Sequence, residues 1–73
     1  MENNLIVLEA PALGGTYIGR VYALGGVLRA EVLRERGSHL EVVTKRSRFP
    51  TVDAAYAWLR EQPALGQHAR LAA

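Results

Sequence analysis

Few residues in this 73-residue chain have the types and spacing that metal binding requires. The chain contains two histidines and no cysteine. Neither His39 nor His68 has a second potential ligand at the short spacing that metal sites use. We therefore expect both to be surface histidines, and we expect no metal and no other cofactor.

The hydroxyl and carboxylate side chains also lack the context that catalysis needs. The serines and threonines are Thr16, Ser38, Thr44, Ser47 and Thr51. None of them sits in a recognisable nucleophile elbow or triad pattern. The acidic residues Glu31, Glu35 and Glu41 alternate with arginines, as solvated charge pairs on a sheet do. Gly14, Gly15 and Gly19 are followed by Arg20 and Val21, whereas a phosphate-binding loop needs Lys and then Ser or Thr. We therefore expect a protein that is not an enzyme.

The clearest local charge feature is the basic run at residues 44–48, which contains Lys45, Arg46 and Arg48. Such a run can contact phosphates or an acidic protein partner. Lys and Arg along an edge strand also protect that strand from aggregation, so both interpretations stay open. The net charge is +2, from nine basic and seven acidic residues. That balance describes a mixed surface, whereas dedicated nucleic-acid binders usually show a denser basic stripe.

Residues 51–62 have the features of a helix that would organise the rest of the chain. Thr51 can act as the N-cap by accepting a hydrogen bond from a free N–H of the first turn. Alanine, the best helix former, is frequent in the body, and Pro63 ends the segment. Apolar residues recur on one side at helical spacing: Val52, Ala55, Tyr56 and Leu59, with Trp58 at the margin. We expect this side to be buried and Trp58 to anchor the core or its edge.

The segments before the helix read as strands joined by glycine turns. The expected strands are residues 5–9, 16–24, 27–35 and 39–48. Pro11 and Gly14-Gly15 interrupt the pattern, so a loop is expected between the first two strands. The turn at residues 36–38 fits either a two-residue or a three-residue loop. These two loop lengths place opposite faces of the last strand inward, so its register and inward face stay unassigned.

Gly25-Gly26 is a two-residue hairpin signal that fixes the register of the central hairpin. With these glycines in the turn, Arg20 faces Glu31 and Tyr22 faces Arg29. The opposite face carries small and apolar residues on which the helix can pack: Gly19, Val21, Ala23, Leu28, Ala30 and Val32. A one-residue slip would place the charged residues under the helix.

The candidate partner-binding residues are the four polar members of this hairpin: Arg20, Tyr22, Arg29 and Glu31. We expect them to lie side by side on a face that nothing in the chain covers. Tyr and Arg are enriched at binding hot spots, so the face could bind a protein partner or form a homodimer interface. An ordinary half-solvated sheet face would have the same pattern.

Together these elements predict an α+β fold. We expect an antiparallel sheet of three to four strands, with one main C-terminal helix packed on one face. Leu65 and Leu71 could hold a short second helix after Pro63, or this tail could fray. The length suits a single domain covering residues 1–73, and a homodimer would add buried area that so small a domain lacks.

The chain shows no signal for a membrane or for export. No apolar run approaches the roughly 20 residues that a membrane span needs. The first residues lack the basic region and long apolar core of a signal peptide. The absence of cysteine fits a reducing compartment, so we expect a cytoplasmic protein without membrane association.

An ordered set of residues runs through the second and later parts of the chain: Val21-Tyr22, Gly25, Ala30, Val32, Phe49-x-Thr51, Trp58-Leu59, Pro63, Leu65-Gly66, Leu71 and Ala72. Their order and spacing resemble those of a small family of type I-F anti-CRISPR proteins. Members of that family are sheets with helices on one side. They bind the repeated backbone subunits of the crRNA-guided surveillance complex and stop target DNA from pairing with the guide. The resemblance implies a non-enzymatic phage or mobile-element protein in a bacterial cytoplasm, with Tyr22 in the contact.

A second resemblance covers residues 44–59. A basic strand followed by Phe49-x-Thr51 and Ala55-x-x-Trp58 is similar to the AP2-like domain at the N-terminus of tyrosine integrases. That family inserts its sheet into the DNA major groove, as β-ribbon readers do. The resemblance implies a small DNA-binding module whose contacts would be Arg20, Arg29, Lys45, Arg46 and Arg48. Against this alternative, the glutamates on the same strands would repel phosphates.

Overall fold

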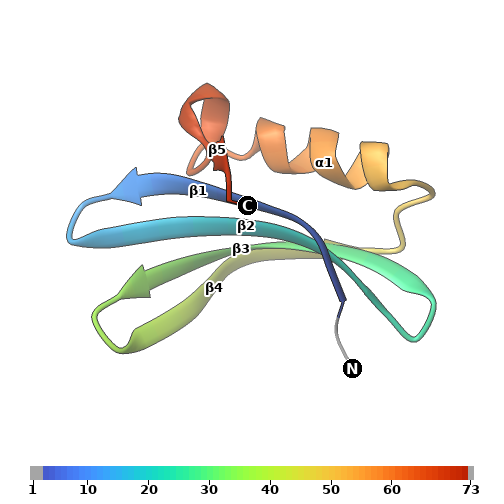
Figure 1. Cartoon of the computed structure of the whole chain (residues 1–73), viewed down its shortest axis with the longest axis horizontal. Coiled ribbons are helices and arrows are strands. Elements are labelled where there is room, and N and C mark those ends of the chain that lie inside the picture. The colour runs from blue at the N-terminus through green and yellow to red at the C-terminus, as the bar shows by residue number, and fades with distance from the viewer. Residues whose placement is uncertain (1–2, 73) are drawn as a thin grey trace.

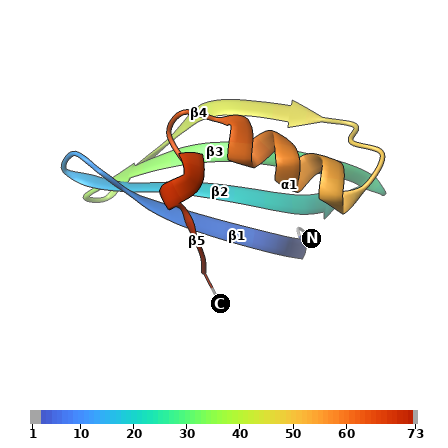
Figure 2. The same cartoon turned by 90° about the horizontal axis from the view of Figure 1, so that it is seen from above.

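The computed structural model describes residues 3–72 as one antiparallel sheet with a helix across one face (Figure 1). The strands are β1 (Asn3–Ala12), β2 (Gly15–Leu24), β3 (Val27–Arg36), β4 (His39–Ser47) and β5 (Arg70–Leu71), in the order β4-β3-β2-β1-β5. The first four strands follow one another as hairpins. The helices are α1 (Val52–Glu61) and the short 3-10 turn η1 (Gly66–His68). Figure 2 shows α1 lying along β2 and β3, with η1 leading the chain back to the β1 edge. The α+β class is therefore as predicted.

The strand count differs from the expected three to four, because the tail after Pro63 forms a fifth strand. The short second helix that the sequence allowed in this tail is the single turn η1. The chain then pairs with β1, with Arg70 opposite Glu9, and the Ala72 N–H donates to the Val7 carbonyl at 2.8 Å. Of the two leucines that could hold a second helix, Leu65 is buried, whereas Leu71 is 67% exposed.

The first strand is longer than predicted, because Pro11 does not interrupt it. β1 continues through Pro11, which pairs with Thr16, and the turn contains only Leu13 and Gly14. Proline is tolerated in a strand whose N–H side is unpaired. β5 pairs only with Leu8 and Glu9, so β1 is an edge strand at Pro11.

The predicted register of the central hairpin is confirmed. Arg20 pairs with Glu31, Tyr22 with Arg29, and the intervening residues follow the same alignment. Gly25 and Gly26 have φ angles of 59° and 76°. Positive φ at both central residues is what a type I′ turn requires, and glycine adopts it without steric cost.

β4 has two features that the sequence pattern left open. Arg36 pairs with His39, so the preceding turn is the two-residue loop Gly37-Ser38. Thr44 pairs with Val32 but Val42 pairs with Leu33, so Val43 is an extra residue in a bulge. The two-residue loop settles the choice that the sequence left open, and the bulge then reverses the alternation of side chains along β4.

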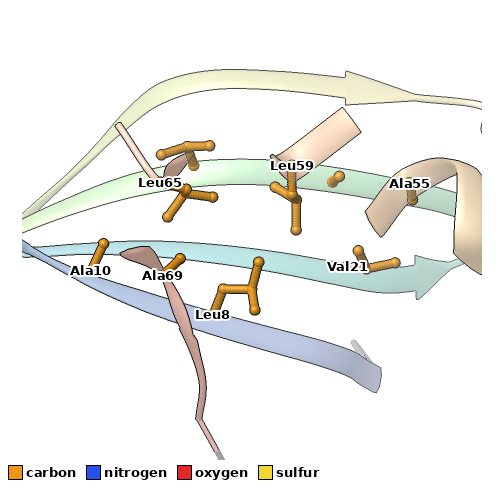
Figure 3. Close-up of a cluster of buried hydrophobic side chains, with 9 residues drawn as sticks. Leu8, Ala10, Val21, Ala55, Leu59, Leu65 and Ala69 are labelled. Carbon is orange, nitrogen blue, oxygen red and sulfur yellow. The ribbon is translucent and has the colours of Figure 1, made fainter. Parts of the chain in front are cut away.

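The core lies between α1 and the sheet. Ala55 and Leu59 of the helix are fully buried against Val21 and Val32, and Leu65 closes the end of this cluster (Figure 3). Gly19 leaves space for the Leu65 side chain, because an added Cβ there would overlap it. Trp58 is half-buried at the core edge, with its ring centroid 5.8 Å from that of Phe49. The predicted inward side of the helix is confirmed.

Both ends of the helix segment are held by specific hydrogen bonds. Thr51 is the N-cap, and its Oγ1 accepts a hydrogen bond from the Ala54 N–H at 3.1 Å. Near the other end, Arg60 is half-buried and donates to the Ala69 carbonyl at 2.9 Å. Arg60 also donates to the Tyr56 hydroxyl within the helix. Its hydrogen bond to Ala69 links α1 to the C-terminal segment. Within residues 3–72, neither helix has the length and apolar character needed to span a membrane.

Candidate interaction surface

The sheet surface opposite α1, called the open face below, is concave. Figure 1 shows the strands curving away from the helix toward both ends, and no element among residues 3–72 packs on that side. By register, the residues of the open face are Val7 and Glu9 of β1, Ile18, Arg20 and Tyr22 of β2, Arg29, Glu31, Leu33 and Glu35 of β3, and Leu40, Val42, Lys45 and Ser47 of β4. Apolar and charged side chains therefore alternate across four strands.

The four predicted partner-binding residues do lie together in the middle of the open face. The Arg20 Nε and Nη2 groups both contact the Glu31 carboxylate. The Arg20 guanidinium carbon lies 4.5 Å from the centroid of the Tyr22 ring. Arg29 pairs with Tyr22 across the strands. The hairpin register alone was sufficient to group these side chains.

Their expected exposure is wrong for two of the four. Tyr22 and Glu31 are each only 6% exposed, although no other element covers them. Arg20 lies against the tyrosine ring and contacts the Glu31 carboxylate, so its side chain covers part of both residues. A sequence pattern shows which face a residue occupies but not whether that face is concave. Tyr22 is consequently a packed residue and not a protruding anchor.

The accessible part of the open face lies toward β4. Val42 is 52% exposed and Leu40 is 58% exposed, whereas Leu33 beside them is buried. Lys45 and Ser47 are also exposed. Sequence reasoning missed the apolar members of this group, because the two possible loop lengths at residues 36–38 left the faces of β4 unassigned.

A cavity of about 330 Å³ opens on the same side, between β2, β3 and β4. Its lining residues are Tyr22, Arg29, Ala30, Glu31, Lys45, Arg46 and Ser47. The Arg29 Nε atom is buried and has no hydrogen-bond partner. Three of the four predicted partner-binding residues, Tyr22, Arg29 and Glu31, thus line one cavity on the open face.

The basic run at residues 44–48 does not form a continuous stripe. Lys45 lies on the open face opposite Glu31. Arg46 points to the helix side, with its guanidinium carbon 5.4 Å from the Phe49 ring centroid. Arg48 follows β4 with a positive φ of 67°, and its N–H donates to the Leu28 carbonyl at 2.9 Å. Of the candidate nucleic-acid contacts, Arg20, Arg29 and Lys45 lie on the open face, and Arg46 also lines the cavity there.

The residues considered for metal chemistry are not brought together. His39 begins β4 and His68 ends η1, and both side chains are exposed. Among the described residues, no group of three or more His, Asp or Glu side chains is arranged to hold a metal ion.

Comparison of the chain with protein-family models, curated protein sequences and solved structures finds no match. The two family resemblances in the sequence therefore stay hypotheses. The basis for a functional proposal is the geometry of the open face, together with the residues that carry those resemblances.

Proposed function

We propose that this protein is a non-enzymatic binding module that holds a protein partner against its open face. The observation that carries this proposal is the concave four-stranded surface that residues 3–72 leave uncovered. The core lies on the other side of the sheet, so a partner can occupy the open face without disturbing α1.

The composition of the open face favours a protein over a nucleic acid. Half-exposed Val42 and Leu40 offer apolar area on β4, and Lys45 and then Arg29 follow further along the same face. Protein interfaces combine an apolar centre with a polar rim in this way. Glu9 of β1 and Glu31 and Glu35 of β3 also lie on the open face, and their negative charges oppose a phosphate backbone.

In its specific form, the proposal names a backbone subunit of a type I CRISPR surveillance complex as the partner. The protein would block target DNA by occupying that subunit. This part rests on the resemblance, and most residues that carry it have core positions here. Val21, Ala30, Val32 and Leu59 are buried, and Trp58 packs against them. These residues support a similar fold, and Tyr22 is the matching residue that lies on the open face.

The experiment is a target-DNA titration of a purified type I-F surveillance complex with and without this protein. The proposal predicts that the protein abolishes DNA binding by the complex and leaves naked DNA unshifted. A complex that binds target DNA equally well at saturating protein would reject this partner. The variant Tyr22→Phe keeps the packed ring, and reduced inhibition by it would locate the contact at the tyrosine hydroxyl.

A second candidate function, a small DNA-binding module, is favoured by one observation. Arg29 and Lys45 line the same cavity, beside the Ser47 hydroxyl. In this case the protein alone would shift naked DNA. Arg29→Gln and Lys45→Gln would each reduce the dependence of log K on log salt concentration by roughly one unit. A salt dependence that both variants leave unchanged would remove this candidate.

A further inference from the structure

The cavity on the open face is built by matched positions on three neighbouring strands. Arg29 of β3 pairs with Ser47 of β4 on one side and with Tyr22 of β2 on the other. Glu31 and Lys45 form the next pair on the same face. The strand registers therefore hold a guanidinium, an ammonium and two hydroxyl groups around one hollow of about 330 Å³.

The charge of this hollow is positive, because its carboxylate is already engaged. Arg20 contacts Glu31 through both Nε and Nη2 and so offsets its charge. The charges of Arg29, Lys45 and Arg46 are then left at the cavity, and the guanidinium carbon of Arg46 lies 5.4 Å from the Phe49 ring centroid. A buried donor without a partner loses its hydration free energy, and the Arg29 Nε is such a donor. An acceptor with negative charge in the cavity would balance these cations and give the Arg29 guanidinium a partner.

We propose that this cavity is an oxyanion site, and that the oxyanion is the carboxylate of an Asp or Glu side chain on the protein partner. This inference rests on the proposed function, because it specifies what the partner presents to the open face. An arginine and a carboxylate make short charge-assisted hydrogen bonds that are stronger than neutral ones. Lys45 and Ser47 supply further donors at the exposed side of the cavity.

The neighbouring residues favour one carboxylate over a chain of phosphates. Beyond Glu31 and Lys45, the next pairs of β3 and β4 on the open face are Leu33 with Val42 and Glu35 with Leu40. Neither pair contains a cation. A nucleic-acid backbone repeats its charge along its length, whereas the side chain of a protein places a single charge at one point.

The test is a titration of the protein with acetate, in which nuclear magnetic resonance measures the chemical shifts. A titration with sodium chloride at equal ionic strength is the reference. The site predicts saturable shifts of the Arg29 Nε–H signal and of the Lys45 and Ser47 amides. Arg29→Gln and Lys45→Gln should each weaken acetate binding by about tenfold, as expected for the loss of a charged hydrogen bond. Lys45 is exposed, so its variant keeps the test independent of any folding defect in the Arg29 variant.

Arg34→Gln is the matched control. Arg34 lies on the same strand and its Nε is likewise buried without a partner, but it pairs with Tyr17 and Glu41 on the helix side. Acetate binding should be unchanged in this variant. Shifts that do not saturate, or an equal loss in Arg34→Gln, would show general charge attraction and overturn the site.

Two further arms separate this inference from the proposed function. If this protein binds acetate but does not bind the surveillance complex, the oxyanion site is supported and that partner is rejected. If Arg29→Gln and Lys45→Gln lose acetate binding but still bind the surveillance complex, the proposed partner carboxylate is rejected. The proposed function then stands. A short DNA duplex that displaces acetate with a steep salt dependence would assign the site to phosphate and overturn the carboxylate.

Discussion

Glu31 is a buried carboxylate on a face that nothing in the described chain covers. It is tolerated because Arg20 contacts it through two nitrogen atoms. The pair also holds the Arg20 guanidinium against the Tyr22 ring, so one ion pair organises the middle of the open face. A buried pair contributes little net stability, but the removal of one partner leaves the other without compensation.

The first prediction follows from this pairing. Glu31→Gln should lower the free energy of unfolding by about 2–3 kcal/mol, less than for a fully buried pair, because Arg20 keeps contact with water. Urea unfolding followed by Trp58 fluorescence measures the change. The control is Glu35→Gln, on the same strand and face but exposed, which should change stability by less than about 0.5 kcal/mol. Equal effects of the two variants would contradict a special role for the ion pair.

At the scale of single elements, helix α1 was readable from sequence because its signals are local. The cap, the alanine-rich body and the 3.6-residue spacing all lie within one segment. The central hairpin was readable for the same reason, since the two glycines define its register. β4 was not, because its bulge depends on how the strand fits β3, and no residue type marks it.

The N-cap of α1 gives the second prediction. Thr51→Ala removes the oxygen that accepts the Ala54 N–H, and should cost about 1 kcal/mol of stability. Thr51→Ser keeps an acceptor at the same position and should stay close to the wild-type protein. Thermal unfolding monitored by circular dichroism distinguishes the two. If the alanine and serine variants unfold at the same temperature, the hydroxyl is not the stabilising group.

Strand β5 could not be predicted because it depends on a contact distant in sequence. Arg60 donates to carbonyl groups of Gly66 and Ala69, which lead into this two-residue strand. The sequence shows only an arginine on the polar side of a helix. Its hydrogen bonds form only after the chain has turned back over η1.

The third prediction concerns this link. Arg60→Met keeps the helix propensity and removes the hydrogen bonds, so β5 should detach from β1 more often. The Ala72 amide, which donates to the Val7 carbonyl, should then exchange its hydrogen at least about tenfold faster, while the α1 amides change less. Arg70→Gln, an exposed change within β5, serves as the control. Unchanged exchange at Ala72 would show that Arg60 does not hold the strand.

For the whole molecule, a single sheet with one helix has one covered face and one uncovered face. The buried cluster lies entirely on the α1 side, and small residues such as Gly19 and Ala30 let the helix approach the strands. Sequence reasoning identified both faces and placed the four polar residues together. It could not foresee the curvature of the open face, because curvature arises from the twist and bulges of all the strands together. It also could not foresee that Tyr22 and Glu31 are buried there.

The central claim is that the open face is the binding surface. The most direct measurement is the affinity of the purified surveillance complex for the wild-type protein and two single variants. Val42→Glu adds a charge at a half-exposed position of the open face, and Ala57→Glu adds the same charge at an exposed position of α1. The account predicts that Val42→Glu weakens binding at least about tenfold, as expected for a charge placed in an apolar interface, and that Ala57→Glu binds like the wild-type protein. Loss of binding in Ala57→Glu with full binding in Val42→Glu would place the partner on the helix side and contradict it.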